Sequence, residues 1–282
     1  RGTAGFVHVS CLAEQAKILM DEVEENNLGR KAMVERWPRW YTCRLCEQDH
    51  HGVVACALGW ACWKTYLGRP ETDEVRRLAM NQLGNGLCDG DHDEDALSVR
   101  EADLSTRLRL GDSEENLLAA QSNLALSYQL LGRFEEGLRM RRDVYFGCLK
   151  VFGAEHVKTL LEANNYAGAL KILKGRFEEA KALLRKTMPV ARRVLGDSHE
   201  LTLKMRWTYA EALYMDDRAT LDDLREAVRT LAETDQIARR VLGGAHPVTT
   251  GIEVEIRKSR AALRAREGDV EPLRAAVEAM AP

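Results

Sequence analysis

The chain has 282 residues, enough for one or two domains, and its charged residues, 30% of the total, leave a formal net charge of -3 at pH 7. A charge so close to balance excludes an overall attraction to nucleic acid or to an anionic membrane, so binding has to depend on local patches. The longest apolar run is far shorter than the ~20 residues that a membrane-spanning helix needs, and no segment resembles a secretory signal.

Seven cysteines occur along the chain in an odd, clustered arrangement. Such an arrangement without a secretory signal predicts reduced thiols, which can hold a metal, in a cytoplasmic or nuclear setting. The sequence begins at Arg1 with no Met, so we expect it to be a piece of a longer protein.

The amino-terminal segment, residues 1–52, carries two pairs of zinc-ligand residue types. His8 and Cys11 lead into an amphipathic helix, and two tryptophans precede Cys43 and Cys46. This order resembles the second half of a RING-CH finger, the variant RING of a class of ubiquitin ligases. The resemblance implies that the first pair completes one zinc site and the second pair another. It also implies that the remaining ligands, a Cys-x2-Cys and a Cys-x-Cys, lie upstream.

Structural zinc takes four nitrogen or sulfur ligands at tetrahedral corners, so two ligands for each ion hold it poorly. We therefore expect zinc in the full-length parent and none tightly bound by this segment alone. The segment departs from the family pattern at Glu47, where many active RING ligases have a basic residue, and in the long gap from Cys11 to Cys43. The resemblance thus predicts the fold more directly than ligase activity, and the chain itself is not expected to be an enzyme.

The same cysteines allow two other interpretations. From Cys43 to Cys56 the spacing Cys-x2-Cys-x4-His-x4-Cys is that of a retroviral-type zinc knuckle, which binds single-stranded nucleic acid. The tight turns of a knuckle require Gly where Glu47 and His50 stand, and basic and stacking residues are sparse here. Alternatively, the cysteines are ordinary core residues, and His50 and His51 belong to a solvated turn.

Residues 53–74 form the predicted connection between the finger and the rest of the chain. The stretch VVACALGWACW is apolar all round, which predicts a buried core helix that ends near Tyr66. Gly68 and Pro70 then interrupt the pattern, and a proline is tolerated in the first turn of the helix that follows.

Four helical hairpins are predicted over residues 75–248. The stretch NLALSYQLLGRFEEGL, which begins at Asn123, reappears 42 residues later as NYAGALKILKGRFEEAK, which begins at Asn165. In each copy, apolar and small residues three and four apart lead to a Gly-Arg turn, after which an acidic start opens a second apolar-periodic run.

A second motif, Gly-x-x-His-x-x-Thr, recurs in the same register. We expect its Gly to end a second helix, its His to cap a helix end in the turn and its Thr to open the next first helix. The three copies begin at Gly153, Gly196 and Gly243.

The period of about 42 residues and these motifs resemble the tetratricopeptide repeats of kinesin light chains. The resemblance covers residues 75–282. It implies an all-α fold, a right-handed superhelix of tetratricopeptide-like helical hairpins, with a truncated zinc-finger half at the amino terminus. Leu124, Ala125 and Tyr128 stand at the packing positions of a first helix, and Gly137 stands where the second helix needs a small residue.

Three features depart from the regular pattern. The first turn is acidic, but residues 89–95 lack the alternation of ligands that an EF-hand requires, so we expect a solvated turn. The fourth turn, residues 216–223, is longer and offers an additional contact surface. Residues 249–282 are expected to form capping helices, because Glu255 replaces a packing residue and Gly268 ends the first of them.

The first helices of stacked hairpins line their concave face, so the residues that face it recur at one repeat position. Asn81, Asn123 and Asn165 share such a position, and Asn can both donate to and accept from an extended peptide backbone. The resemblance implies this role; alternatively, these residues only satisfy neighbouring helix groups. The other residues predicted to line the groove are basic, amide or aromatic: Arg77, Asn85, Gln129, Lys171, Lys204 and Trp207.

Such a lining suits an acidic peptide segment with an aromatic or apolar anchor. The sequence contains no phosphate-binding loop or nucleophile motif that would indicate catalysis. The predicted function is therefore protein binding, as the substrate-recognition part of a RING-CH-type ubiquitin ligase whose parent contacts a ubiquitin-conjugating enzyme. The alternative is a cargo or scaffold adaptor resembling kinesin light chain, with no enzymatic role. A zinc-knuckle nucleic-acid binder is the least favoured interpretation, and no membrane partner is expected.

Overall fold

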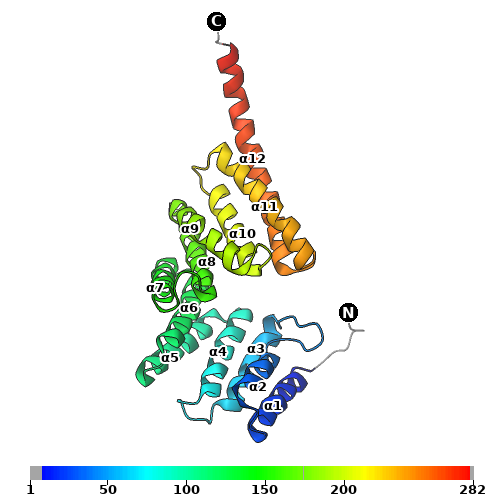
Figure 1. Ribbon diagram of the computed structural model, residues 1–282, viewed down its shortest axis with the longest axis vertical. Coiled ribbons are helices and arrows are strands. Elements are labelled where there is room, and N and C mark those ends of the chain that lie inside the picture. The colour runs from blue at the N-terminus through cyan, green and yellow to red at the C-terminus, as the bar shows by residue number, and fades with distance from the viewer. Residues whose placement is uncertain (1–7, 174, 280–282) are drawn as a thin grey trace. The chain divides into compact units, whose positions relative to one another are not determined.

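Helices make up the regular structure in the part of the chain that the computed structural model describes, residues 8–173 and 175–279, with side chains through residue 268. Within these ranges the β-type pairing is limited to an isolated bridge between Thr42 and Asp49. The predicted all-α fold is therefore confirmed. None of the described helices combines the length and the apolar character that crossing a membrane requires. The chain forms two units, Arg1–Gly137 and Leu138–Pro282. Figure 1 labels the α-helices of both.

The first unit begins with a helical cluster that has an aromatic core. The buried ring of Trp40 packs edge-on against Tyr66, with ring centroids 6.0 Å apart, and Trp37 contacts both rings. The connection to the hairpins ends at Asp73, whose side chain accepts hydrogen bonds from two backbone N–H groups of the next helix. The helices of this unit are α1 (Val9–Glu25), α2 (Gly29–Arg36), the 3-10 helix η1 (Trp37–Trp40), α3 (Gly52–Tyr66), α4 (Glu74–Asp89), α5 (Asp93–Leu110) and α6 (Glu114–Leu130).

The apolar helix α3 is not buried on all sides, contrary to the prediction. Leu58 is buried, whereas Val53 is 81% and Trp60 41% exposed. The reason is that α3 packs mainly along α4, where small residues let the two backbones approach. A Cβ on Gly86 would lie 2.5 Å from the Ala55 carbonyl oxygen, so only glycine fits at this crossing. One face of α3 therefore meets α4, and another remains in contact with solvent.

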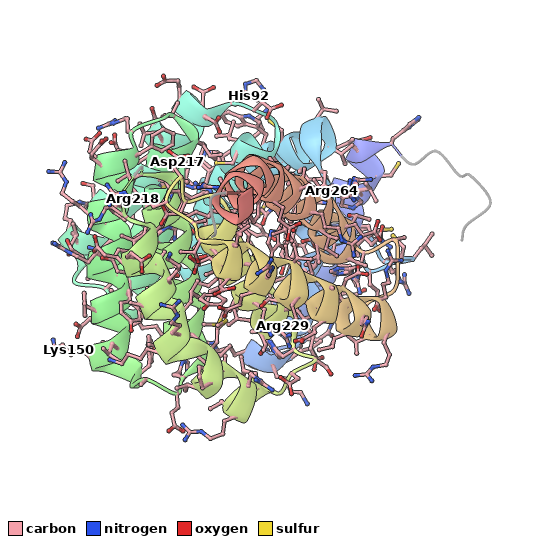
Figure 2. All side chains as sticks on the ribbon, turned by 90° about the horizontal axis from the view of Figure 1, so that it is seen from above. His92, Lys150, Asp217, Arg218, Arg229 and Arg264 are labelled. Atoms are coloured by element: carbon pink, nitrogen blue, oxygen red, sulfur yellow. The ribbon has the colours of Figure 1, made fainter. Side chains whose placement is uncertain are left out.

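The acidic segment between α4 and α5 forms a surface turn, as the sequence predicts. Its last carboxylates, on Asp93, Glu94 and Asp95, lie in the first turn of α5, where negative charge is favourable beside the free N–H groups of the helix. His92 is exposed in this turn (Figure 2). Helix stability therefore accounts for the acidic cluster.

The second unit contains the remaining hairpins and a long terminal helix. Alanines with no exposed surface lie within its core, among them Ala163, Ala167 and Ala180, and they let neighbouring helices approach closely. Leucines such as Leu160 and Leu203 fill the space between the helices. The helices are α7 (Phe134–Phe152), whose first turn belongs to the first unit, α8 (Val157–Ile172), α9 (Phe177–Leu195), α10 (Glu200–Tyr214), α11 (Leu221–Val241) and α12 (Pro247–Ala279).

The Gly-x-x-His-x-x-Thr motif builds the inter-repeat turns of this unit. Gly196 follows α9 with a φ of +91°, in the left-handed region that favours glycine. His199 then caps α10, because its Nδ1 accepts a hydrogen bond from the Leu201 N–H at 3.1 Å. His156 and His246 accept in the same way from the N–H two residues further on. The prediction that the Thr opens the helix is wrong in detail: this residue lies inside the first turn and is buried. The three residues are Thr159, Thr202 and Thr249.

The longer turn between α10 and α11 also lies at the surface. Asp217 and Arg218 are exposed there (Figure 2). Thr220 begins α11 with a reciprocal cap: its Oγ1 accepts from the Asp223 N–H at 3.1 Å, and the Asp223 carboxylate accepts from the Thr220 N–H at 2.9 Å. The extra residues of this turn therefore lead into a well-defined helix start.

The terminal helix does not end at Gly268, contrary to the prediction. α12 continues through this residue to Ala279, because one glycine lowers helix stability by only about 1 kcal/mol and helix-forming residues surround it. Glu255 is buried, accepts a hydrogen bond from Tyr214 and pairs with Lys258 at 2.7 Å.

Candidate peptide-binding groove

Two of the three predicted asparagines contact each other across neighbouring first helices. Nδ2 of Asn123 on α6 donates to Oδ1 of Asn81 on α4 at 2.7 Å, between residues 42 positions apart. Both side chains are half-buried, and neither the Asn81 amide nitrogen nor the Asn123 amide oxygen has a partner among the described residues. One donor and one acceptor therefore remain, which is what pairing with an extended peptide backbone requires.

Asn165 has a different role in the second unit. Its Nδ2 donates to Oε2 of Glu162, on the same helix, at 3.3 Å. That carboxylate oxygen also lies 3.5 Å from Nη1 of Arg141 on α7, and both charged side chains are buried. The third asparagine thus supports a buried ion pair.

Arg77 and Asn85 lie on α4, one helical turn to either side of Asn81. Nη1 of Arg77 donates to a backbone carbonyl at 2.6 Å, and its Nε lies 3.8 Å from Asp112. Oδ1 of Asn85 accepts a hydrogen bond from Nη2 of Arg100, a residue of α5, at 3.2 Å. The predicted lining residues of the first unit are therefore connected to α5 and to the start of α6.

The predicted basic residues of the second unit have acidic partners within it. Lys171 on α8 pairs with Glu211 on α10, and Lys204 pairs with Glu200 at 2.6 Å. Burial raises the pKa of Glu211, and Lys171 opposes this rise. The positive charge expected on this part of the groove is offset by these carboxylates.

Two predicted lining residues pack closely against glycines of neighbouring helices. Cγ of Gln129 lies 2.9 Å from the place that a Cβ on Gly137 would occupy, so the small residue expected at this position does allow a close approach. The ring of Trp207 lies 2.3 Å from the place of a Cβ on Gly251 of α12. The Trp207 indole N–H is buried and has no hydrogen-bond partner among the described side chains and backbone groups.

A pocket of about 750 Å³ lies in the first unit beside the paired asparagines. Its polar lining includes Asn81, Asn85 and Arg100, and its apolar lining includes Leu126 and Leu130 of α6, which are 37% and 48% exposed. The remaining lining comes largely from η1, the segment after it and α4, and includes Trp37, Tyr41, Asp49, His50, Leu78 and Asp89. The pocket therefore joins hydrogen-bonding groups to exposed leucines.

Sequence reasoning missed Arg100 and the two leucines as parts of this site. A signal for Arg100 exists, because it stands at a position within a second helix where later hairpins carry a buried leucine, Leu184 or Leu231. The leucines give no such signal, since an apolar residue on a first helix predicts packing as readily as binding.

Cys43 and Cys46 are brought together by a tight turn. The Cys43 N–H donates to the Gln48 carbonyl at 2.8 Å, and Glu47 adopts a φ of +56° inside the turn. Hydrogen bonds from the backbone N–H groups of Cys46 and Leu45 lower the pKa of the Cys43 thiol. The two cysteines therefore lie in one turn, and its backbone N–H groups favour the thiolate form of Cys43.

The other predicted ligands are not gathered around this turn. His8 and Cys11 are exposed at the start of α1. His51 is exposed and lies 3.8 Å from Asp89, and Cys56 belongs to α3, where burial raises its pKa. Among the side chains that the structure describes, no three His, Cys, Asp or Glu residues are close enough to hold a metal ion. The residues of the zinc-knuckle interpretation therefore do not form one site.

Comparison with known proteins identifies the repeats. Residues 117–158 and 163–200 match the model of the tetratricopeptide repeat. A similar solved structure is a putative kinesin light chain with nearly identical TPR-like repeats from Podosopora anserina: identity is 19%, the TM-score is 0.51, and 83% of this chain and 98% of that chain are covered. Another is BtubC (BKLC) from P. vanneervenii, with 15% identity, a TM-score of 0.60, and coverage of 81% of this chain and 92% of that chain. No curated protein matches the sequence.

At these identities the likeness to solved structures concerns the fold. The family match does not include residues 1–52, so the RING-CH resemblance stays a prediction. The match, the period of 42 residues and the helical hairpins agree with one another. The hairpins of this chain thus have the fold of these solved repeat structures, and residues 117–158 and 163–200 resemble tetratricopeptide repeats in sequence as well.

Proposed function

We propose that the chain is a protein-binding scaffold module that holds an extended peptide segment of its partner in the pocket of the first unit. The observation that carries this proposal is the combination of exposed leucines and open amide groups in one place. Leu126 and Leu130 lie one helical turn apart and offer an apolar anchor point. Asn81 and Asn123 offer a donor and an acceptor for the peptide backbone. The kinesin light chain names of similar structures support an adaptor role without catalysis.

The charge preference of this groove depends on the first unit. Lys171 and Lys204 already have carboxylate partners, so they add little net attraction for an acidic segment. Any preference for acidic peptides therefore has to come from cations near the pocket.

Paired variants test the proposal. Asn81→Ala with Asn123→Ala, and separately Leu126→Ser with Leu130→Ser, are expected to lose the same set of partners in quantitative pull-downs from a native extract. Each lost buried hydrogen-bonding group is expected to weaken binding by about 1 to 3 kcal/mol. Leu108→Ser is the matched control, because Leu108 is 58% exposed on α5 and does not line the pocket. Circular dichroism spectra should be unchanged, and retention of every partner by both pocket variants would place binding elsewhere.

A second proposal concerns the amino-terminal segment. Together with residues upstream of it, this segment would form a RING-CH finger that recruits a ubiquitin-conjugating enzyme, and the repeats would select substrates. The turn around Cys43 and Cys46 supports this, because backbone N–H groups directed at a thiol stabilise the thiolate form that binds zinc. All seven cysteines are unpaired, which favours a reducing cytoplasmic or nuclear compartment.

Zinc analysis by mass spectrometry tests the second proposal. The chain purified without chelator is expected to hold well under one zinc ion, and a form extended upstream is expected to hold two. One stoichiometric zinc ion that is lost in Cys56→Ala would instead favour the zinc-knuckle interpretation. An extended form that binds two zinc ions but builds no ubiquitin chains would leave the finger a structural element.

A further inference from the structure

Arg100 is a buried cation that is bonded only to neutral groups. The residue is 5% exposed, and its Nη1 donates to the Asn123 carbonyl and to Ser127 Oγ, each at 2.8 Å. Its Nη2 donates to Asn85 at 3.2 Å, and its Nε has no hydrogen-bond partner. No ion pair joins it to a carboxylate within residues 8–173 and 175–268. A buried charge without a counter-ion is unfavourable, so this arrangement requires an explanation.

The next hairpin contains the same cation together with its counter-ion. Arg100 follows the small residue of its second helix, Ala96, by four positions, and Arg141 follows Gly137 by four. Arg141 pairs with the buried Glu162 on the following first helix. The position of Glu162 one 42-residue repeat earlier is Ala120. The first hairpin therefore keeps the arginine but lacks the carboxylate.

The arginine is not a requirement of the hairpin itself. In the third and fourth hairpins the same position, four residues after Ala180 and Ala227, is occupied by Leu184 and Leu231, both fully buried. A neutral side chain thus fits there without difficulty. Space for the cation is provided by Gly84 on α4, where a Cβ would lie 3.3 Å from Arg100 Cγ. Burial lowers the pKa of Arg100. The neighbouring Cys88 thiol opposes this shift, and so does Asp93, which is too distant to form an ion pair.

We propose that Arg100 anchors a single carboxylate of the bound peptide, an Asp or Glu side chain, in the pocket of the first unit. The partner would supply the group that Glu162 supplies to Arg141 within the chain. This inference rests on the proposed peptide-binding function. Arg100 lines the same pocket as Leu126 and Leu130, so the segment carries an apolar residue close to its acidic one.

The charges around the pocket restrict the ligand further. Asp49 and Asp89 also line it, and both are exposed. A run of acidic residues or a doubly charged phosphate would be repelled by these carboxylates, whereas one carboxylate can reach the buried guanidinium. The pocket is therefore expected to select one acidic side chain next to an apolar one.

Fluorescence anisotropy with short synthetic peptides tests this. The probes are short peptides built from Ser and Leu residues with a single Glu at the centre. The comparison peptides have Gln or phosphoserine in place of that Glu. Wild type is expected to bind the Glu peptide at least about tenfold more tightly than either counterpart. Arg100→Leu, the residue that later hairpins carry, should bind the Glu and Gln peptides equally. Arg109→Leu, an exposed arginine on the same helix, should keep the preference.

A second variant separates loss of recognition from loss of fold. Ala120→Glu gives Arg100 an internal carboxylate of the kind that Arg141 has, so it should raise the melting temperature and remove the preference for the Glu peptide. Suppose that wild type binds the Glu and Gln peptides equally and that the double variant Leu126→Ser with Leu130→Ser binds neither. This result would contradict the role of Arg100 but support the proposed peptide-binding pocket. If wild type binds none of the peptides, the proposed peptide-binding function of the pocket is contradicted as well.

Discussion

Substituting Glu162→Ala tests how strongly a buried ion pair stabilises the second unit. Nη1 of Arg141 lies 3.5 Å from Oε2 of Glu162, and the two side chains are 7% and 9% exposed. Because the buried guanidinium of Arg141 loses its ion pair with Glu162, the free energy of unfolding is expected to fall by about 3 to 5 kcal/mol. Asn165 loses its hydrogen-bond acceptor at the same time, which adds about 1 kcal/mol. Urea unfolding followed by far-UV circular dichroism measures the change.

The double variant Arg141→Leu with Glu162→Ala is the control. Leu184 and Ala120 occupy the equivalent positions in neighbouring hairpins, so both replacements are compatible with the packing. Replacing a buried pair with apolar residues is often neutral, and the double variant is expected to recover most of the lost stability. A loss below about 1 kcal/mol in Glu162→Ala, or a double variant less stable than the single one, would refute this reasoning.

Three other substitutions test packing and capping by urea unfolding. Leu124→Ala removes a side chain that is 3% exposed, and the cavity is expected to lower the free energy of unfolding by about 2 to 5 kcal/mol; an unchanged midpoint would mean that the repeat register is wrong. Gly86→Ala places a Cβ 2.5 Å from a backbone oxygen and is expected to lower the free energy of unfolding by about 1 to 3 kcal/mol. In the control Gly68→Ala the new Cβ meets no atom within 4 Å, so no effect is expected. Equal stability of these two variants would contradict the close crossing of α3 and α4. Thr220→Ala removes the cap of α11 and is expected to lower stability by about 1 kcal/mol at neutral pH. Burial would raise the pKa of Asp223, but hydrogen bonds from Thr220 prevail and lower it. The stabilisation that the Asp223 carboxylate gives to the cap is therefore present above the usual carboxyl pKa of ~3.9 and is lost as the pH falls through the lowered value. A cost of Thr220→Ala that stays constant down to strongly acidic pH would contradict the carboxylate's part in the cap.

The hairpins and their turns could be predicted from the sequence because short-range interactions decide them. Gly196 adopts a positive φ that only glycine enters easily, and His199 reaches an N–H group just two residues away. Gly137 is small because the next helix has to approach α6 closely. Each of these signals lies within a few residues of the feature that it predicts, so no knowledge of the tertiary fold is needed.

Features that depend on distant residues could not be predicted in the same way. The exposure of Trp60 follows from the face on which α4 packs, and periodicity gives no direction for a helix that is apolar all round. The charge of Lys171 is offset by Glu211, 40 residues away, and register alone does not reveal that the two side chains meet. Register therefore predicts which residues share a repeat position, but it does not predict which of their charges already have partners within the protein.

The two units use the polar residues of their first helices differently. In the second unit Asn165 supports a buried ion pair and Lys171 pairs with Glu211, so these groups contribute to the stability of the array. In the first unit the asparagines pair with each other and keep a free donor and acceptor, and Arg100 has no carboxylate among the described residues. A polar group that is satisfied within the fold has little left to offer a ligand, because breaking its bond offsets the new one. Recognition is therefore expected to be concentrated in the first unit.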